Sequence, residues 1–156
     1  VLDWAAVVRD VALDLAALIA DRGIDFSLDA VPAPVRAHEW ALRELTRNLL
    51  HNAIKHTPPG AALALHLVAD ARTAALTVSD SGPGISATLR ERLFQPFATD
   101  HRAAPSSAGS GLGLAICREI VQSLAGQIDL NNRQNGGRIE GLDAIVRLPL
   151  HIAPSA

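Results

Sequence analysis

Apolar residues recur at helical spacing near the start of the chain. They stand at alternating intervals of four and three residues: Trp4, Val8, Val11, Leu15 and Leu18. This spacing places them on one side of a helix and predicts a helix over residues 3–22. Asp3 can cap its first turn, and Gly23 can end it.

Two further stretches predict helices. A helix over about residues 38–56 follows the break at residues 31–34, where VPAP interrupts the chain, and stops at the HTPPG turn of residues 56–60. Another helix is predicted over about residues 111–125, with Gly126 at a C-cap position. Its apolar face comprises Leu112, Ile116, Ile120 and Leu124.

Alternating apolar residues predict strands. Residues 62–68 carry leucine at every second position, as in a strand that buries one side. Residues 74–80 are the expected antiparallel partner, joined to this strand through residues 69–72. The other predicted strands are 24–28, 127–130 and 142–150, and a Gly-rich turn at 135–137 lies between the last two.

A short helix around residues 86–93 and a mobile loop over residues 98–110 complete the pattern. The loop sequence ATDHRAAPSSAGS is small and polar and has no periodicity. Together the elements predict a sheet with helices packed on one face, which is a two-layer α/β sandwich.

Composition narrows the class of protein. The chain has 156 residues, of which 49% are hydrophobic and 19% are charged, so we expect one globular domain over residues 1–156. The net charge of −2 gives no basic excess for nucleic acid or an anionic membrane. The single cysteine, Cys117, cannot form an internal disulfide and suits a reducing compartment. The apolar N-terminal stretch carries too many charges for a membrane span or a signal peptide.

The helix predicted over residues 38–56 has a polar side. At about 100° per residue, one arc of the helix holds Glu44, Asn48, His51, Asn52 and Lys55. Asn48 and Asn52 lie one turn apart at the border with the apolar face. Asparagine is a poor helix former and is costly to bury without partners, so the pair indicates a polar pocket where amide oxygens meet a ligand or a metal. The alternative is a solvated helix face with incidental asparagines.

Asp80 is the last residue of its predicted strand. It shares parity with Leu76 and Val78, so its carboxylate points toward the buried side, where it needs a hydrogen-bond donor. Gly82 and Gly84 follow, and they allow atoms of another molecule to approach the backbone closely. The alternative is an ordinary Asp-Ser-Gly turn in which Asp80 bonds its own backbone.

The segment GSGLGL, residues 109–114, opens the third predicted helix. Amides of a glycine loop at a helix N-terminus bind anions, because their N–H groups are free and the helix dipole is positive there. Leu114 stands where a dinucleotide fingerprint needs Gly or Ala, and the Gly-Lys-Ser/Thr ending of a phosphate loop is also missing. The segment therefore indicates phosphate contact outside both of these folds, or a flexible hinge with close helix packing.

Four motifs in order resemble the catalytic, ATP-binding domain of bacterial sensor histidine kinases. NLLHNAIKHTPPG (48–60) is similar to the asparagine box, and DSGPGI (80–85) is similar to the first glycine box. LFQPF (93–97) is similar to the phenylalanine box, and GSGLGLAICREIVQSLAGQI (109–128) is similar to the second glycine box with its helix. The resemblance covers nearly the whole chain. It implies the Bergerat (GHKL-type) α/β sandwich, with a mixed, mostly antiparallel sheet, three main helices on one face and an ATP lid over residues 98–110.

The resemblance implies a catalytic set in the asparagine box. Asn52 is implied to coordinate Mg²⁺ through its side-chain oxygen. Asn48 is implied to position the metal or the phosphates, and Lys55 is implied to reach a phosphate as a point charge. His56 takes a position where the family often has an aromatic residue or histidine near the nucleotide.

The other motifs imply contacts to the base and the phosphates. Asp80 is implied to accept a hydrogen bond from the adenine amino group, where guanine has a carbonyl. Gly82 and Gly84 are implied as the floor of the adenine pocket, and Phe94 and Phe97 as anchors of the lid. The second glycine box is implied to bring backbone amides to the phosphates. The full set of implied nucleotide contacts is Asn48, Asn52, Lys55, His56, Asp80, Gly82, Gly84, Ile85, Phe97, Gly109, Ser110, Gly111, Leu112 and Gly113.

Two features depart from the family pattern. Only His38 precedes a Glu, as a phosphoacceptor histidine does, and its continuation HEWALRE does not match that motif. We therefore interpret the chain as an excised catalytic domain without the dimerisation, phosphoacceptor and sensor domains. Residues 131–150 are longer than the usual last hairpin, and either the pair Gly136 and Gly137 or Gly141 fills the last glycine box.

The resemblance implies a protein-histidine kinase of two-component signal transduction. Such a domain binds Mg·ATP and donates the γ-phosphoryl group to a histidine on the missing dimerisation domain. Hydrolase relatives carry a Glu where Asn48 stands, and Asn48 cannot take a proton from water, whereas Glu44 lies one turn too early. This favours transfer to histidine. Two alternatives stay open: a Bergerat-type ATPase or anti-sigma-like Ser kinase, and a non-catalytic nucleotide-binding module.

The implied partners are ATP and ADP, the chain's own dimerisation and phosphoacceptor domain, and a response regulator. Nucleic acid and direct membrane contact are not expected, and Mg²⁺ is the implied cofactor. The resemblance also implies a monomeric fragment and a cytoplasmic location, as part of an inner-membrane bacterial sensor.

Overall fold

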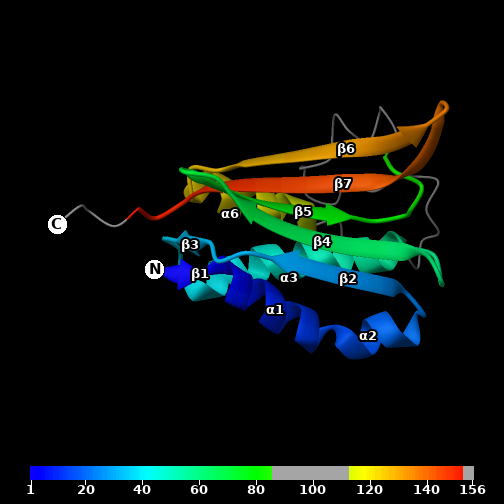
Figure 1. Cartoon of the computed structure of the whole chain (residues 1–156), viewed down its shortest axis with the longest axis horizontal. Helices are drawn as coiled ribbons and strands as arrows, with labels where there is room; N and C mark the ends of the chain where they lie inside the picture. The colour runs from blue at the N-terminus through cyan, green and yellow to red at the C-terminus, as the bar shows by residue number, and fades with distance from the viewer. Residues whose placement is uncertain (86–112, 153–156) are drawn as a thin grey trace.

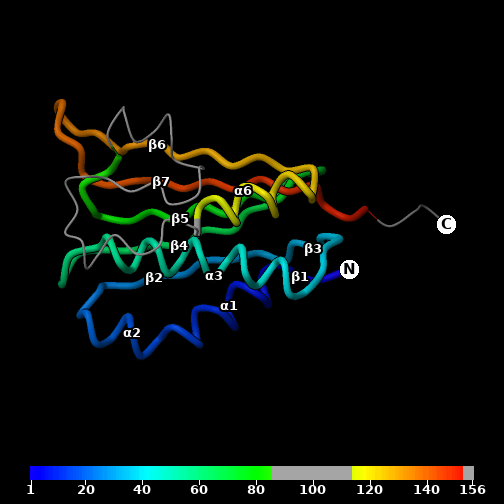
Figure 2. Tube along the Cα trace, turned by 180° about the vertical axis from the view of Figure 1, so that it is seen from behind, coloured from blue at the N-terminus to red at the C-terminus, as the bar shows by residue number. Residues whose placement is uncertain are grey.

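The computed structural model describes residues 1–85 and 113–152, and they form a sheet with helices on one face (Figure 1, Figure 2). This confirms the predicted two-layer α/β sandwich. The helices are α1 (Trp4–Asp14), α2 (Ala16–Asp21), α3 (Glu39–His56) and α6 (Gly113–Ser123). The strands are β1 (Leu2–Asp3), β2 (Asp25–Ala30), β3 (Pro34–Val35), β4 (Ala62–Ala69), β5 (Thr73–Ser79), β6 (Gln127–Asn135) and β7 (Arg138–Pro149).

Within the described part of the chain, the main sheet has five strands in the order β2-β4-β5-β7-β6. β2 pairs parallel with β4, because the chain crosses over between them through α3. The other neighbours pair antiparallel, including the predicted β4–β5 hairpin. The sheet is therefore mixed and mainly antiparallel, as the resemblance implied. β1 and β3 form a separate two-stranded ribbon.

The core lies between the sheet and the helices. Alternate residues of β4 and β5 are buried against each other in register, as Leu65 with Val78 and Leu67 with Leu76 show. Helix α3 packs between α1 and α6. The indole Nε1 of Trp4 donates to Thr46 Oγ1 at 3.1 Å, which joins α1 to α3 inside this core. Among the described residues, no helix combines the length and the apolar content that crossing a membrane requires.

The prediction of one helix over residues 3–22 is wrong in one respect, because the helix is interrupted at Leu15. Asp3 caps α1 as predicted, with its Oδ1 accepting from the Ala5 amide at 3.1 Å. At Leu15 the backbone leaves helical geometry, with φ −99° and ψ 5°. The break turns the next segment, so that α2 buries Ile19 while Leu18 is only partly buried. Gly23 ends the segment with φ 63°, as predicted.

The end of α6 also differs from prediction by one residue. Ala125, not Gly126, adopts the left-handed conformation, with φ 57°. The Gly126 amide bonds the Val121 carbonyl at 2.9 Å, and the Ala125 amide bonds the Gln122 carbonyl at 3.1 Å. This is the Schellman pattern with Ala125 at C′. Gly126 serves a different purpose, because a Cβ there would overlap the Arg147 carbonyl of β7.

The last hairpin is longer than the strands predicted at 127–130 and 142–150. β6 and β7 continue through polar residues to a tight turn at Gly136 and Gly137, whose φ angles are 59° and 83°. A register shift between Arg133 and Gln134 marks a β-bulge in this extension. The hairpin therefore projects past the end of β5, on the side of the molecule where α3 also ends (Figure 1).

Candidate functional site

The polar side of α3 lies where the sequence predicted it. Asn48 and Asn52 are half-buried at the border of the face that packs on the core, and His51 is exposed. Asn48 Nδ2 lies 3.5 Å from Glu44 Oε1, at the limit of a hydrogen bond. The Asn52 amide has no hydrogen-bond partner within the part of the chain that the structure describes. It is therefore the amide of this pair that can take a ligand without breaking a bond to those residues.

The C-terminal end of α3 is held by an arginine from α2's following turn. Arg22 Nη2 donates to the carbonyls of Lys55, at 3.4 Å, and Thr57, at 3.2 Å. The last carbonyls of a helix lack partners inside the helix, and a cation is favoured at that end. The backbone that presents Lys55 and His56 is thus fixed. The Lys55 side chain is half-buried, and burial lowers the pKa of its ammonium group.

Asp80 is buried at the end of β5, with 3% of its surface exposed. Its Oδ1 accepts from the Gly82 amide at 2.9 Å and from the Leu142 amide at 3.1 Å. The Asp80 carboxylate therefore has the predicted inward orientation. It also makes the alternative contact, a turn in which Asp80 bonds its own backbone. Burial raises the pKa of the Asp80 carboxyl, while those two N–H groups and the charges of His56 and Arg133 oppose this rise.

The two glycines after Asp80 bring the chain close to other parts of itself. A Cβ at Gly82 would overlap the His56 carbonyl, so the loop rests directly on the end of α3. Gly84 has φ 74°, and a Cβ there would overlap the Asn132 side chain. The sequence predicted that atoms of another molecule approach these glycines closely. Among the described residues, His56 and Asn132 of the chain itself make these close contacts. The contact with His56 brings the asparagine-box helix and the Asp80 loop together.

Gly141 is the glycine of the last hairpin that lies at the site. A Cβ on Gly141 would overlap the Asp80 carbonyl and the Arg133 guanidinium. Gly136 and Gly137 instead form the hairpin turn, and a Cβ on either would have no described atom within 4 Å. Of the two alternatives for the last glycine box, Gly141 is therefore the one that lies next to Asp80.

Sequence reasoning missed two side chains at this site, Asn132 and Arg133 of β6. Both bond the backbone of the segment from Asp80 to Ile85. Their strand was predicted to end at Leu130, because the polar residues that follow have no alternation. No local signal marks these two side chains, because the pairing of Arg133 with Gly141 depends on the register of the extended hairpin.

Part of the predicted site lies outside the described residues. This holds for the short helix at 86–93, the phenylalanine box and the loop at 98–110. Gly113 is described as the first residue of α6. The predicted site residues outside the description are Phe94, Phe97, Gly109, Ser110, Gly111 and Leu112.

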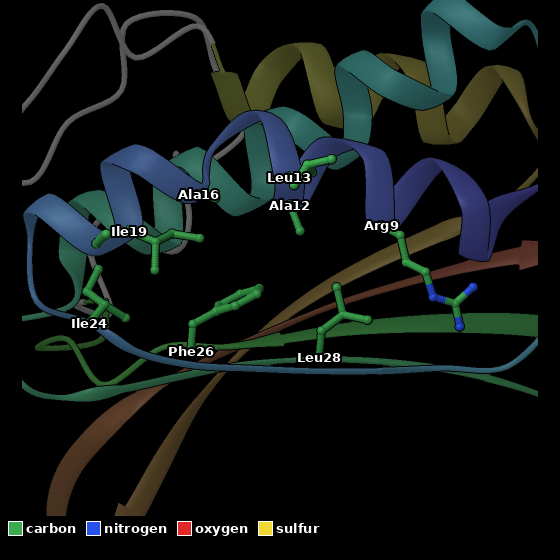
Figure 3. Close-up of a pocket in the computed structure, with 9 residues that line it drawn as sticks. Arg9, Ala12, Leu13, Ala16, Ile19, Ile24, Phe26 and Leu28 are labelled. Carbon is green, nitrogen blue, oxygen red and sulfur yellow. The ribbon is translucent and has the colours of Figure 1, made fainter.

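An apolar groove lies apart from these polar groups, between helices α1 and α2 and the edge strand β2 (Figure 3). Its volume is about 470 Å³. Phe26 and Leu28 point from the strand toward Ala12, Ala16 and Ile19 of the helices. Among the described residues that line it, Arg9 alone is charged, and its Nη2 donates to the Ala30 carbonyl at 2.9 Å. The described lining of the groove thus offers no side-chain amide or carboxylate group of the kind that the predicted chemistry requires.

The family of the chain follows from comparison with known proteins. The family model described as histidine kinase-, DNA gyrase B-, and HSP90-like ATPase matches residues 37–152. The chain belongs to this ATPase family. The matched range contains α3, the Asp80 loop, α6 and the last hairpin, which are the parts of the structure that form the candidate site.

Individual relatives within this ATPase family are sensor histidine kinases. The chain is 33% identical over 148 residues to the sensor protein kinase PmrB of Pseudomonas aeruginosa, an alignment that covers 95% of the chain and 30% of PmrB. It is 37% identical over 129 residues to the histidine-protein kinase/phosphatase MprB of Mycobacterium ulcerans, which covers 81% of the chain and 25% of MprB. The chain thus spans about a quarter to a third of these relatives. The enzyme type that it matches is the histidine kinase.

Solved structures agree with this assignment. The mycobacterial sensor histidine kinase MprB has a TM-score of 0.81 at 29% identity, covering 96% of this chain and 95% of that one. Full-length ShkA in complex with AMPPNP has a TM-score of 0.80 at 25% identity, covering 99% and 31%. The histidine kinase ThkA in complex with the response regulator protein TrrA has a TM-score of 0.77 at 25% identity, covering 96% and 41%. The fold is that of a histidine kinase catalytic domain.

Proposed function

We propose that the domain binds Mg·ATP between the end of α3 and the Asp80 loop and donates the γ-phosphoryl group to a histidine on a separate domain. The observation that carries this proposal is the state of the Asp80 carboxylate. All the hydrogen bonds that it accepts from described residues reach Oδ1. A buried carboxylate with one oxygen left for a further donor is suited to receive an N–H group from a ligand.

The adenine amino group is a donor of this kind. A base placed on the Asp80 loop would donate from its exocyclic amino group to Asp80, whereas guanine would present a carbonyl there. Two acceptors facing each other repel, and the hydrogen bond is lost as well. The site therefore favours ATP over GTP. The solved ShkA complex with AMPPNP, an adenine nucleotide analogue, shows that a protein of this fold takes such a ligand.

The phosphates would extend from the base toward α3. The half-buried Asn52 amide fits Mg²⁺, which takes few protein oxygens in addition to phosphate oxygens and water. Mg²⁺, when bound, supplies charge neutralisation on the phosphates. Asn48, one turn earlier, would position the phosphates, and the ammonium of Lys55 would reach one of them as a point charge.

Transfer is favoured over hydrolysis by the identity of residue 48. An amide cannot take a proton from water, so Asn48 cannot act as a general base. Glu44 is one turn away, and its Oε1 faces the Asn48 amide. We therefore expect the isolated domain to hydrolyse ATP slowly. We also propose a response regulator as the downstream partner, which the solved ThkA–TrrA complex supports, and a cytoplasmic location within a sensor protein of the bacterial inner membrane.

Nucleotide titration of the 156-residue chain tests the proposal. We expect Asp80→Asn to weaken ATP binding by about tenfold or more, which corresponds to losing a hydrogen bond to a charged group. Asn52→Ala should leave binding without Mg²⁺ unchanged and abolish the gain in affinity that Mg²⁺ gives. Asp129→Asn and Asn135→Ala are matched controls, since they make similar changes at exposed positions of the β6–β7 hairpin. Wild-type affinity and Mg²⁺ dependence in both site variants would exclude this location.

A further inference from the structure

Two adjacent residues of β6 bond both ends of the loop that carries Asp80. At the far end of the loop, Asn132 Oδ1 accepts from the Ile85 amide at 2.9 Å. The same side chain donates from Nδ2 to the Ile85 carbonyl, also at 2.9 Å. One amide side chain therefore satisfies both backbone groups of a single residue and fixes its orientation.

Arg133 holds the near end of the loop. Its Nη2 donates to the Asp80 carbonyl at 2.7 Å, and its Nη1 donates to Asp143 Oδ1 at 2.6 Å. The guanidinium is held on two sides, because Asp143 lies on β7 and Asp80 at the end of β5. A planar group with fixed donors is better suited to such a bridge than an ammonium group.

The strand register explains how Arg133 reaches across β7. Arg133 pairs with Gly141, and Asn132 pairs with Leu142, whose amide donates to Asp80 Oδ1. Because Gly141 has no side chain, the guanidinium can cross β7 at this point and meet the Asp80 carbonyl. The β-bulge directly follows Arg133. Bulges redirect side chains near functional sites.

Within the described loop, one hydrogen bond restrains the conformation, from the Gly82 amide to Asp80 Oδ1 at 2.9 Å. The loop contains Gly82 and Gly84, and Gly84 occupies the left-handed region with φ 74°. Glycines are conformationally permissive, so a short loop with two of them samples many arrangements unless other contacts select one. Hydrogen bonds weaken steeply as their angle departs from linear. A base-reading carboxylate on such a loop needs an external support.

We propose that Asn132 and Arg133 are positioning residues that set the base specificity of the nucleotide site. They hold the Asp80 carboxylate and the loop after it in the geometry that accepts the adenine amino group. The inference rests on the proposed binding of ATP at Asp80. It adds that the discrimination between adenine and guanine depends on β6, which does not itself contribute a group that touches the base.

The test compares the affinities of the 156-residue chain for Mg·ATP and Mg·GTP in support variants and in control variants. Asn132→Ala and Arg133→Gln remove the two supports. Asn135→Ala and Arg147→Gln remove similar bonds of the same hairpin, to Glu140 Oε1 at 3.1 Å and to Asp129 Oδ2 at 2.9 Å, away from the loop. We expect each support variant to lower the ATP-to-GTP preference by about tenfold, the effect of one charge-assisted hydrogen bond, and the controls to keep it.

A ratio of affinities separates positioning from simple loss of stability. A variant that only unfolds part of the population weakens ATP and GTP binding equally, and this result would overturn the inference. Arg133→Lys, which keeps the charge but has a single donor nitrogen, should recover part of the preference. Asn132→Asp, which keeps the acceptor for the Ile85 amide, should be intermediate. An unchanged preference in all support variants would also overturn the inference while leaving wild-type ATP binding in place. A wild-type chain with no preference for ATP would instead overturn the proposed role of Asp80.

Discussion

At the residue scale, Asp80 is buried, and the hydrogen bonds that its carboxylate accepts from the described residues reach Oδ1 alone. Burial is the main cause of its raised pKa, and the donors and positive charges around it compensate only in part. Such a group lowers stability in its ionised form and gains from a ligand that supplies a donor. A buried group whose pKa is shifted by desolvation and by nearby charges is a candidate for a functional site, which is why the proposal centres on Asp80.

The pH dependence of folding follows from the sign of this shift. The folded state binds the Asp80 proton more tightly than the unfolded state, since the pKa is raised on folding. The stabilisation that the protonated Asp80 carboxyl contributes is therefore present below its pKa in the unfolded state. It is lost as the pH rises through the higher pKa of the folded state. Asp80→Asn cannot ionise, so we expect the variant to lose this slope and to be at least as stable as wild type at neutral pH. Urea unfolding between about pH 4 and pH 7 measures the difference.

The opposite result has a clear meaning. If Asp80→Asn lowers the free energy of unfolding at neutral pH, the ionised carboxylate stabilises the fold. Burial of Asp80 then does not lower the stability of the domain.

Gly141 is a second residue whose identity the site requires. A Cβ would meet the Asp80 carbonyl, which is backbone and cannot move aside easily. Gly141→Ala should therefore destabilise the domain by about 1–3 kcal/mol, the usual cost of overpacking, and weaken ATP binding. Gly136→Ala is the control, because its positive φ of 59° costs stability at a position where a Cβ would meet no described atom within 4 Å. Thermal unfolding with nucleotide titration distinguishes the two, and equal ATP affinity in both variants would contradict the role of Gly141.

At the element scale, the helices and the inner strands could be predicted from periodicity. The stripe of α1, the amphipathic α3 and the alternation in β4 and β5 each follow from burial of one face. The break at Leu15 could not be predicted, since the spacing of apolar residues continues through it. The extension of β6 could not be predicted either, because Asn132 and Arg133 bond a distant loop and follow no local pattern.

The end of α6 gives a stability prediction at this scale. Ala125 is exposed and held at φ 57°, a conformation that costs a residue with a Cβ more than glycine. After allowing for the larger entropy of the unfolded glycine chain, Ala125→Gly should stabilise the domain by about 1 kcal/mol. Ala6→Gly, at an exposed position inside α1, should destabilise it by about the same amount. Chemical denaturation of both variants checks the prediction, and a loss of stability in Ala125→Gly would contradict the assigned strain.

At the scale of the whole molecule, the site is assembled from segments far apart in sequence. The end of α3, the loop after β5 and the β6–β7 hairpin meet at one end of the sheet (Figure 1). The sequence allowed Asn48, Asn52 and Asp80 to be selected by residue type and face, and the structure places their segments next to each other. The support from β6 depends on strand register and on the missing side chain of Gly141, which only the folded chain reveals.

Binding of Mg·ATP between Asn52 and Asp80, as proposed, is tested most directly by a crystal structure of the chain with AMPPNP and Mg²⁺. We predict the adenine amino group within hydrogen-bonding distance of the Asp80 carboxylate and the Mg²⁺ ion coordinated by the Asn52 side-chain oxygen. Asn132 and Arg133 should keep their bonds to the loop in that complex. A nucleotide bound elsewhere, or one whose base does not contact Asp80, would contradict the account.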